Sequence, residues 1–213
     1  MNSSNCKGSM VLRSTHLDEA EISRRLAGAR KEAGSPSFPA ELLVGAPRAA
    51  AVLIPFLCIE HAWHLLFIRR NSALPEHSGQ VAFPGGRADP EDPNLETTAL
   101  REAYEEIGLS PADVRILGRL YDFLTITNYL VTPVVGVIPW PYPLRLSTEE
   151  VSRVFTIPLD WLADPQNREE QLRSLPPPYN PVPVIYFHPY HGEVLWGASA
   201  TFTVALLKIL FDE

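Results

Sequence analysis

The chain has 213 residues, of which 46% are hydrophobic, so it is long enough for one well-buried domain and short for two. Its net charge of −7 argues against a nucleic acid as the main partner. No signal-peptide pattern and no apolar run of about eighteen residues occurs, so we expect a cytoplasmic protein with no membrane partner. Cys6 and Cys58 match neither a zinc site nor a disulfide framework, which favours a reducing setting.

The first predicted element is a helix. From His16 to Ala33, apolar residues recur at helical spacing among many charges, and the sequence Gly34-Ser35-Pro36-Ser37 then interrupts the pattern. We therefore expect an N-terminal helix and linker over residues 1–38, followed by the main domain over residues 39–213.

Eight apolar segments, several of them rich in β-branched residues, predict strands. In chain order they are Ala49–Cys58, Trp63–Ile68, Val81–Phe83, Val114–Phe123, Tyr129–Ile138, Val151–Phe155, Val184–Phe187 and Val194–Trp196. We expect the first two to be antiparallel and the last two to form a hairpin. The third should end at a turn made by Pro84, Gly85 and Gly86, where glycine permits unusual backbone conformations.

Helices and loops fill the remaining chain. Asn94 is suited to cap a helix that runs to Ile107, and Gly108 is suited to end it. A short helix or turn is expected over Pro158–Leu162, a long loop or hairpin over Pro165–Pro183, and a closing helix over Ala198–Phe211. This order of elements predicts an α/β (α+β) fold in which a mixed sheet lies between layers of helices.

The helix that follows Asn94 carries the most informative chemistry. Glu102 and Glu106 fall on one of its faces with Glu105 beside them, and an apolar stripe lies behind. Like charges at this spacing destabilise a helix, and a bound cation removes the penalty. A bare acidic triplet is more often a solvated surface. The glycine turn upstream and the terminal glycine favour a site for a hard cation such as Mg²⁺.

Two neighbours are suited to complete this site. A backbone carbonyl of the Gly85-Gly86 turn is accessible as a further metal ligand. Arg101 lies four residues before Glu105 and can orient it through a charge-assisted hydrogen bond. Such a site supports attack of water on a diphosphate, with one carboxylate acting as the base.

Several other residues are candidates with two interpretations each. Arg69, Arg70 and Arg87 are placed to bind substrate phosphates, or they are surface charges that pair with the acidic loop. His77 and Gln80 either bind substrate or hold their own loop.

Glu149 and Glu150 have two interpretations as well. They either supply a distal acid to the metal site or enter a helix capped by Ser147, and the capping pattern favours the helix.

At this point the sequence resembles a known family. Gly86, Arg101-Glu102, Glu105-Glu106 and Gly108-Leu109 are similar to the Nudix box of Nudix hydrolases. Arg101 is one residue further from Gly86 than in that motif, and the first glutamate of the motif has no counterpart. Three residues are candidates for its role: Asp89, Glu91 and Asp92.

The segment upstream resembles one subfamily, the coenzyme A diphosphatases. The similar residues are Leu65-Leu66, Arg70, Leu74, His77 and the run Gly79-Gln80-Val81-Ala82-Phe83-Pro84-Gly85-Gly86. Asn71 and Pro75 depart from that signature, which has serine and arginine there.

The resemblance implies a Nudix fold, with Mg²⁺ or Mn²⁺ held by Glu102 and Glu106, often with Glu105. It implies cleavage of coenzyme A or acyl-CoA to 3′,5′-ADP and 4′-phosphopantetheine or its acyl form. The alternatives are another nucleoside diphosphate derivative, such as ADP-ribose or a dinucleotide polyphosphate, and a Nudix-fold binding module without catalysis. The N-terminal helix and the proline-rich loop are candidate surfaces for a homodimer.

Overall fold

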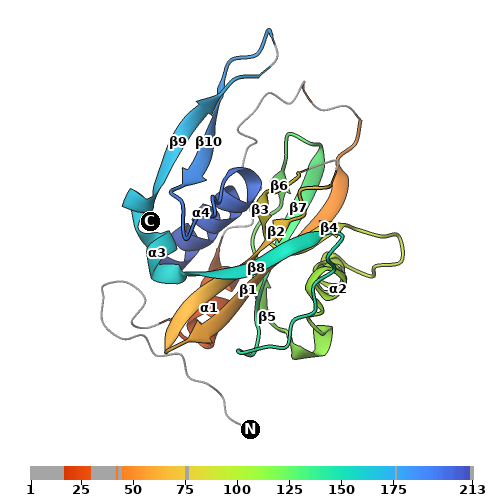
Figure 1. Ribbon diagram of the computed structural model, residues 1–213, viewed down its shortest axis with the longest axis vertical. Helices are drawn as coiled ribbons and strands as arrows, with labels where there is room; N and C mark the ends of the chain where they lie inside the picture. The colour runs from red at the N-terminus through yellow and green to blue at the C-terminus, as the bar shows by residue number, and fades with distance from the viewer. Residues whose placement is uncertain (1–16, 30–41, 43–44, 75–76, 176, 212–213) are drawn as a thin grey trace.

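In the computed structural model, the described residues are 17–29, 42, 45–74, 77–175 and 177–211. They form a large sheet with helices on both of its faces (Figure 1). The helices are α1 (Glu19–Gly28), α2 (Leu95–Ile107), α3 (Leu159–Ala163) and α4 (Gly197–Phe211). The strands are β1 (Arg48–Ile59), β2 (Ala62–Arg70), β3 (Val81–Ala82), β4 (Gly85–Arg87), β5 (Arg115–Arg119), β6 (Phe123–Leu124), β7 (Tyr129–Val137), β8 (Val151–Pro158), β9 (Arg168–Arg173) and β10 (Val182–Phe187). Across these residues, no helix is long and apolar enough to cross a membrane.

The sheet is mixed, as expected. β1 and β2 form the predicted antiparallel hairpin, whose turn residues Glu60 and His61 have φ of 47° and 67°, the left-handed values that a tight two-residue hairpin turn requires. β1 also pairs with β7 in parallel, and β8 pairs with β2 antiparallel. The sheet order β3-β2-β1-β7-β5 places β1 and β2 near the centre.

The third predicted strand ends before Pro84, as expected, but Gly85 and Gly86 form the strand β4 and not a turn. β3 pairs with the C-terminal half of β2, whereas β4 pairs with the N-terminal half of β1. Glycine is required at this point because the backbones approach closely. A Cβ atom at Gly85 would lie 2.4 Å from the carbonyl oxygen of Ala51, and Gly85 has φ of 157°.

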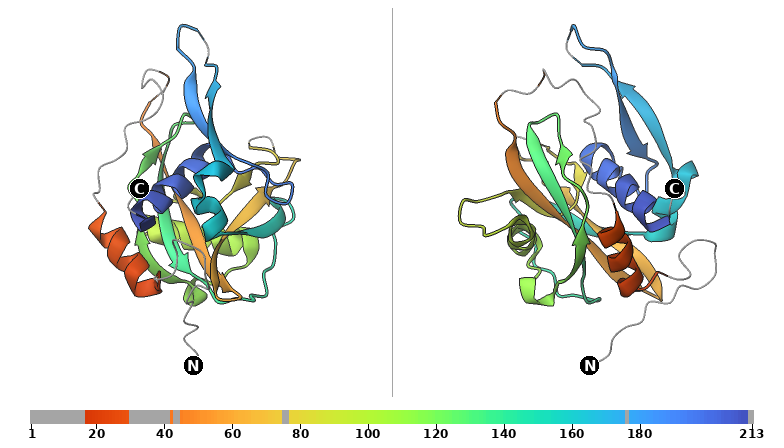
Figure 2. Two further views of the ribbon diagram at one scale, coloured as in Figure 1. Left: turned by 90° about the vertical axis from the view of Figure 1, so that its left-hand side faces the viewer. Right: turned by 180° about the vertical axis from the view of Figure 1, so that it is seen from behind.

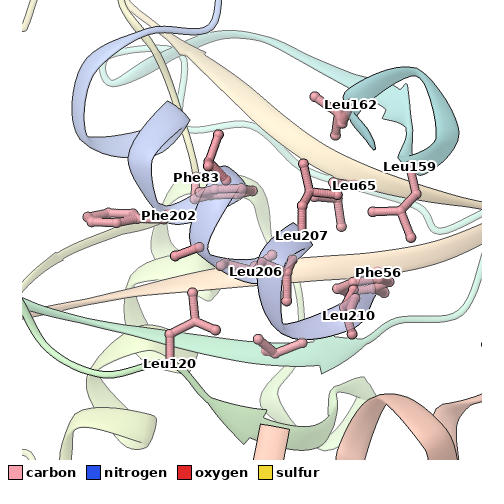
Figure 3. Close-up of a cluster of buried hydrophobic side chains, with 14 of the residues drawn as sticks. Phe56, Leu65, Phe83, Leu120, Leu159, Leu162, Phe202, Leu206, Leu207 and Leu210 are labelled. Atoms are coloured by element: carbon pink, nitrogen blue, oxygen red, sulfur yellow. The ribbon is translucent and has the colours of Figure 1, made fainter. Parts of the chain in front are cut away.

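Two apolar cores cover the two faces of the sheet, and the views in Figure 2 show α2 on one side and α1 and α4 on the other. On the first side, Ala103 and Ile107 of α2 are fully buried with Leu53 of β1. On the second side, Leu206 and Leu210 of α4 lie against the sheet (Figure 3). Each large apolar side chain buried in this way contributes roughly 1.5–3 kcal/mol before the entropy cost. The two cores together fix α2 against the strands.

α1 belongs to the second core. Ile22 and Leu26 are buried there, and the indole Nε1 of Trp63 in β2 donates to the carbonyl oxygen of Leu17 at 2.7 Å. The helix is shorter than predicted, and residues 30–33 lie outside the described part of the chain.

Two other strand predictions needed correction. The segment Val114–Phe123 is divided into β5 and β6, because Pro133 on the facing strand β7 has no N–H to continue the ladder. The strand expected at Val194–Trp196 does not form a hairpin with β10. β10 pairs along its whole length with β9, and it meets Trp196 through a single bridge from Tyr186.

The hairpin of β9 and β10 extends beyond the body of the molecule (Figure 2). This agrees with the hairpin alternative for the proline-rich segment. Cys58 of β1 is disulfide-bonded, although the cysteine spacing did not predict a disulfide framework.

Candidate active site

α2 begins and ends where the sequence predicts. The side chain of Asn94 accepts a hydrogen bond from the backbone N–H of Thr97 at 2.8 Å, which caps the first turn. Gly108 has φ of 67°, and its N–H donates to carbonyl oxygens of the last turn. The buried side chains of Ala99, Ala103 and Ile107 determine which side of the helix meets the sheet, and Glu106 lies on this buried side.

Glu106 is the most buried carboxylate of α2, with 1% of the residue exposed. Its Oε2 accepts the backbone N–H of Gly85 at 3.0 Å, and its Oε1 accepts from Nη1 of Arg70 at 3.3 Å. Burial raises the pKa of Glu106 to about 8 against these two favourable contacts, and the charges of Glu102 and Glu150 act in the same direction as burial. A negative charge at this position therefore lacks sufficient compensation from the protein alone.

Glu102 lies against the backbone of β4. A Cβ atom at Gly86 would be 2.5 Å from Oε2 of Glu102, so a side chain there would displace this carboxylate from its observed position. Burial raises the pKa of Glu102 as well, while Arg101 opposes the shift by donating to its Oε1 at 2.9 Å. The two carboxylates are therefore both partly desolvated beside β4.

Arg101 connects the acidic loop to α2. Its Nε and Nη2 donate to the two carboxylate oxygens of Asp92 at 3.2 and 3.0 Å, a bidentate pair. Its Nη1 also donates to Glu105 at 2.9 Å, as predicted, and Nη2 donates to the carbonyl of Arg87 at 3.0 Å. The hydrogen bonds to Asp92, as the largest cause, and to Glu102 raise the pKa of Arg101.

The carboxylate oxygens of Asp92 are occupied by hydrogen bonds from neighbouring residues. Besides Arg101, it accepts the hydroxyl of Thr98 at 2.8 Å and the backbone N–H of Asp89 at 3.0 Å. The hydrogen bonds from Arg101 come first among the causes that lower the pKa of Asp92 to about 2. Of the three acidic loop residues considered from the sequence, Asp92 thus positions the arginine.

Glu150 does not enter a helix, so the favoured capping interpretation is wrong. The N–H groups of Glu150 and Val151 both donate to the carbonyl of Ser147, which makes a turn, and β8 begins at Val151. Tertiary pairing with β2 overrides the local capping pattern. The turn brings Glu150 within electrostatic range of Glu102 and Glu106, since its charge raises the pKa of both.

The three candidate arginines lie at different places around the sheet. Arg70 meets Glu106 on the α2 side, whereas Arg69 lies on the opposite face of the sheet, where its Nη1 is 3.2 Å from Oε2 of Glu193. Successive strand residues point to opposite faces, which explains the division. Arg87 is exposed at the end of β4 and contributes its backbone carbonyl to the Arg101 contacts.

His77 and Gln80 contact each other. Nδ1 of His77 lies 3.0 Å from Oε1 of Gln80, and both belong to the loop between β2 and β3. The Gln80 carbonyl accepts the backbone N–H of Arg70 at 2.9 Å, so this pair is tied to the end of β2.

The donor chemistry fits a hard divalent cation. Glu102 and Glu106 are desolvated carboxylates in a cradle that a side chain at Gly86 would fill, and like charges raise the pKa of both. Within the described residues, no three acidic, histidine or cysteine side chains already converge as a metal cluster. Arg101 donates to Oε1 of Glu102 and to Oε2 of Glu105, so the second oxygen of each carboxylate is not engaged by Arg101.

Sequence reasoning missed one charged group altogether. Glu193 is only 5% exposed and forms ion pairs with Arg69 of β2 and Arg153 of β8. No motif marks it, because its loop contacts the strands only in the folded chain.

Comparison with known proteins agrees with this geometry. The NUDIX domain family model matches residues 47–177. The chain is 38% identical over 162 residues to the Nudix hydrolase NudL of Photorhabdus laumondii, covering 72% of this chain and 80% of that protein. It is 42% identical over 154 residues to NudL of Yersinia pestis, covering 72% and 75%.

The solved structures that are similar to this chain include a Nudix hydrolase from Alicyclobacillus acidocaldarius. It has 23% sequence identity to this chain and a TM-score of 0.47, and the match covers 58% of this chain and 85% of that chain. A C. elegans Ap4A hydrolase in a binary complex has 19% identity, a TM-score of 0.45 and coverage of 53% and 81%. The family model spans more than half of the chain, and the relatives share well over a quarter of their residues with it across most of their length. The chain therefore belongs to the Nudix hydrolase family.

Proposed function

We propose that the protein hydrolyses the diphosphate bond of coenzyme A or acyl-CoA in a metal-dependent reaction, giving 3′,5′-ADP and 4′-phosphopantetheine or its acyl form. The observation that carries the diphosphatase assignment is the burial of Glu106 between Gly85 and Arg70, beside Glu102 and Glu150. The similarity of Arg70, His77 and the Gly79–Gly86 run to coenzyme A diphosphatases supports the choice of substrate.

Glu102 and Glu106 would hold Mg²⁺ or Mn²⁺, with Glu105 and the carbonyl of Gly86 as further ligands. When bound, the ion neutralises the diphosphate and lowers the pKa of coordinated water. Arg101 positions Glu102 and Glu105 through hydrogen bonds of 2.9 Å to each. It thereby determines where these carboxylates stand relative to the buried Glu106.

Arg70 is the best placed of the predicted substrate-binding residues. Its Nη1 donates to Glu106, and its Nε is buried and has no hydrogen-bond partner among the described residues. A buried donor without a partner is costly, and a substrate phosphate beside it would supply an acceptor. We also propose substrate contacts for three further residues, Arg87, His77 and Gln80.

The reaction forms a bond between a water oxygen and phosphorus and breaks the bridging P–O bond, so the second phosphate leaves. The water proton must pass to a carboxylate. Glu105 is a candidate because its side chain is 53% exposed, and Glu150 is another because its charge reaches Glu102 and Glu106.

Product analysis tests this proposal. The purified protein is incubated with coenzyme A and Mg²⁺ or Mn²⁺, and the products are separated by ion-pair chromatography. We expect equal amounts of 3′,5′-ADP and 4′-phosphopantetheine, loss of turnover in Glu106→Gln, and retained turnover in Glu170→Gln, which removes an exposed carboxylate on β9. Cleavage of ADP-ribose or a dinucleotide polyphosphate in place of coenzyme A would favour the other substrates, and binding without cleavage would favour a binding module.

A further inference from the structure

A second charged group lies near the C-terminal end of β2 and the N-terminal end of β8, on the face of the sheet that α4 covers. The buried carboxylate of Glu193 accepts Nη1 of Arg69 at 3.2 Å on Oε2 and Nη1 of Arg153 at 3.2 Å on Oε1. This face carries the α4 core, whereas Glu106 and Arg70 lie on the α2 face. The group is therefore separate from the carboxylates of α2.

The fold holds the two arginines side by side. Figure 1 shows β2 and β8 side by side. Arg69 and Arg153 are direct partners in the antiparallel pairing of these strands, so their side chains emerge next to each other on one face. Glu193 reaches them from a tight turn in which Tyr190 and Glu193 exchange two backbone hydrogen bonds of 2.9 and 3.0 Å. One rigid carboxylate thus orients both guanidinium groups.

The charges of this group do not balance. Two guanidinium groups face one carboxylate, which leaves one net positive charge. Each guanidinium has five N–H donors, and the contact with Glu193 uses one nitrogen of each. The arginine side chains are 45% and 54% exposed, while the Glu193 side chain is 5% exposed. The free donors therefore face solvent above a buried acid, an arrangement suited to a phosphate dianion.

This group is also near the proposed diphosphate site. Arg69 is adjacent in sequence to Arg70, and Glu150 precedes Arg153 by three residues along the entry to β8. At about 3.3 Å per strand residue, the backbone at Glu150 and Arg153 is separated by about 10 Å. The two groups thus lie on opposite faces at the same end of the β2 and β8 pair, so a substrate that engages both passes around the C-terminal end of β2 and the N-terminal end of β8.

We propose that Arg69 and Arg153, oriented by Glu193, bind a phosphomonoester of the substrate at a distance from the scissile diphosphate. This inference rests on the proposed function, in which that group is the 3′-phosphate of coenzyme A. ADP-ribose has no such phosphate, so the arginine pair selects between the substrate classes. Arg69 then contacts the substrate as predicted, but through a second phosphate and on the other face of the sheet.

A purely structural role for the pair, in which the arginines fasten the Tyr190–Glu193 turn, makes a different prediction. Loss of Arg153 would then affect all substrates alike. The informative quantity is therefore the preference for coenzyme A over dephospho-coenzyme A, taken as the ratio of their kcat/KM values, because this ratio does not depend on the fraction of folded enzyme.

The first experiment measures this ratio in the full-length protein with Mg²⁺. We expect the wild type to prefer coenzyme A, and Arg153→Gln to reduce the preference about tenfold, since charge-assisted hydrogen bonds to a phosphate are lost. Arg119→Gln removes an exposed arginine on β5 and should keep the preference. An unchanged ratio in Arg153→Gln, or no preference in the wild type, would overturn the inference.

The second experiment measures binding without turnover. Calorimetry in the absence of metal should show that adenosine 3′,5′-bisphosphate binds more tightly than AMP to the wild type, and that Arg153→Gln abolishes the difference. If the wild type hydrolyses neither form of coenzyme A, the proposed function fails, yet this difference would still support the arginine pair. Equal affinities for the two nucleotides would refute the phosphomonoester site whatever the turnover result.

Discussion

Replacing Glu106 by glutamine should change how the stability of the metal-free protein depends on pH. Glu106 is 1% exposed, and burial raises its pKa from the ordinary 4.5 to about 8. The unfolded chain therefore releases this proton at a lower pH than the folded protein does. Between about pH 4.5 and 8 the unfolded state binds fewer protons at this group, so the free energy of unfolding must fall as the pH rises.

The loss of unfolding free energy can be calculated from the raised pKa of Glu106. One proton contributes at most about 1.4 kcal/mol per pH unit, so the full interval corresponds to a loss of up to about 5 kcal/mol. Relaxation around the charge reduces this figure, and we expect a loss of several kcal/mol. Glutamine retains an acceptor for the N–H of Gly85 and has no proton to release in this range, so the variant should lack this part of the pH dependence.

Urea unfolding of the wild type and Glu106→Gln, measured with a metal chelator from pH 5 to 8.5, tests the reasoning. The variant should gain stability relative to the wild type steadily as the pH rises. Acidic residues that do not interact with Glu106 contribute equally to both proteins and cancel in the difference. A difference that stays constant with pH would refute the assignment of a desolvated, protonated Glu106.

Three further predictions concern the same site. Gly86→Ala should weaken Mg²⁺ binding by about tenfold or more, because its Cβ would lie 2.5 Å from Glu102, whereas Gly28→Ala meets no atom within 4 Å and should bind normally in the same titration. Asp92→Asn should lower the free energy of unfolding by about 1–3 kcal/mol, because it weakens the pair with Arg101, and an unchanged urea midpoint would contradict this. Glu150→Gln should lower the pKa of Glu106 in the metal-free protein by removing a like charge, so the fall of unfolding free energy with pH should end at a lower pH than in the wild type, which an unshifted urea-unfolding profile would exclude.

α2 could be predicted from local sequence alone. Its cap at Asn94, its stop at Gly108 and its apolar stripe all describe the helix that forms, and helical periodicity then sets which carboxylates face the sheet. The position of Arg101 relative to Glu105 followed from the same spacing. These features depend on residues within a few positions of one another.

The features that were missed depend on contacts between distant segments. Gly85 and Gly86 resemble a turn locally, and only their pairing with β1 makes them a strand. The pattern before Glu150 caps a helix in isolation, yet pairing of β8 with β2 decides its structure. The separation of Arg69 from Arg70 was accessible from strand alternation, although the acid that receives Arg69 was not.

We propose that the carboxylates of α2 act on coenzyme A in preference to other nucleoside diphosphates. The most direct measurement is a competition in which one preparation, with Mg²⁺, receives equal concentrations of coenzyme A, ADP-ribose and a dinucleotide polyphosphate. We expect 3′,5′-ADP and 4′-phosphopantetheine to form fastest, and to be absent with Glu106→Gln. Faster consumption of either other substrate, or equal product formation by that variant, would contradict the account.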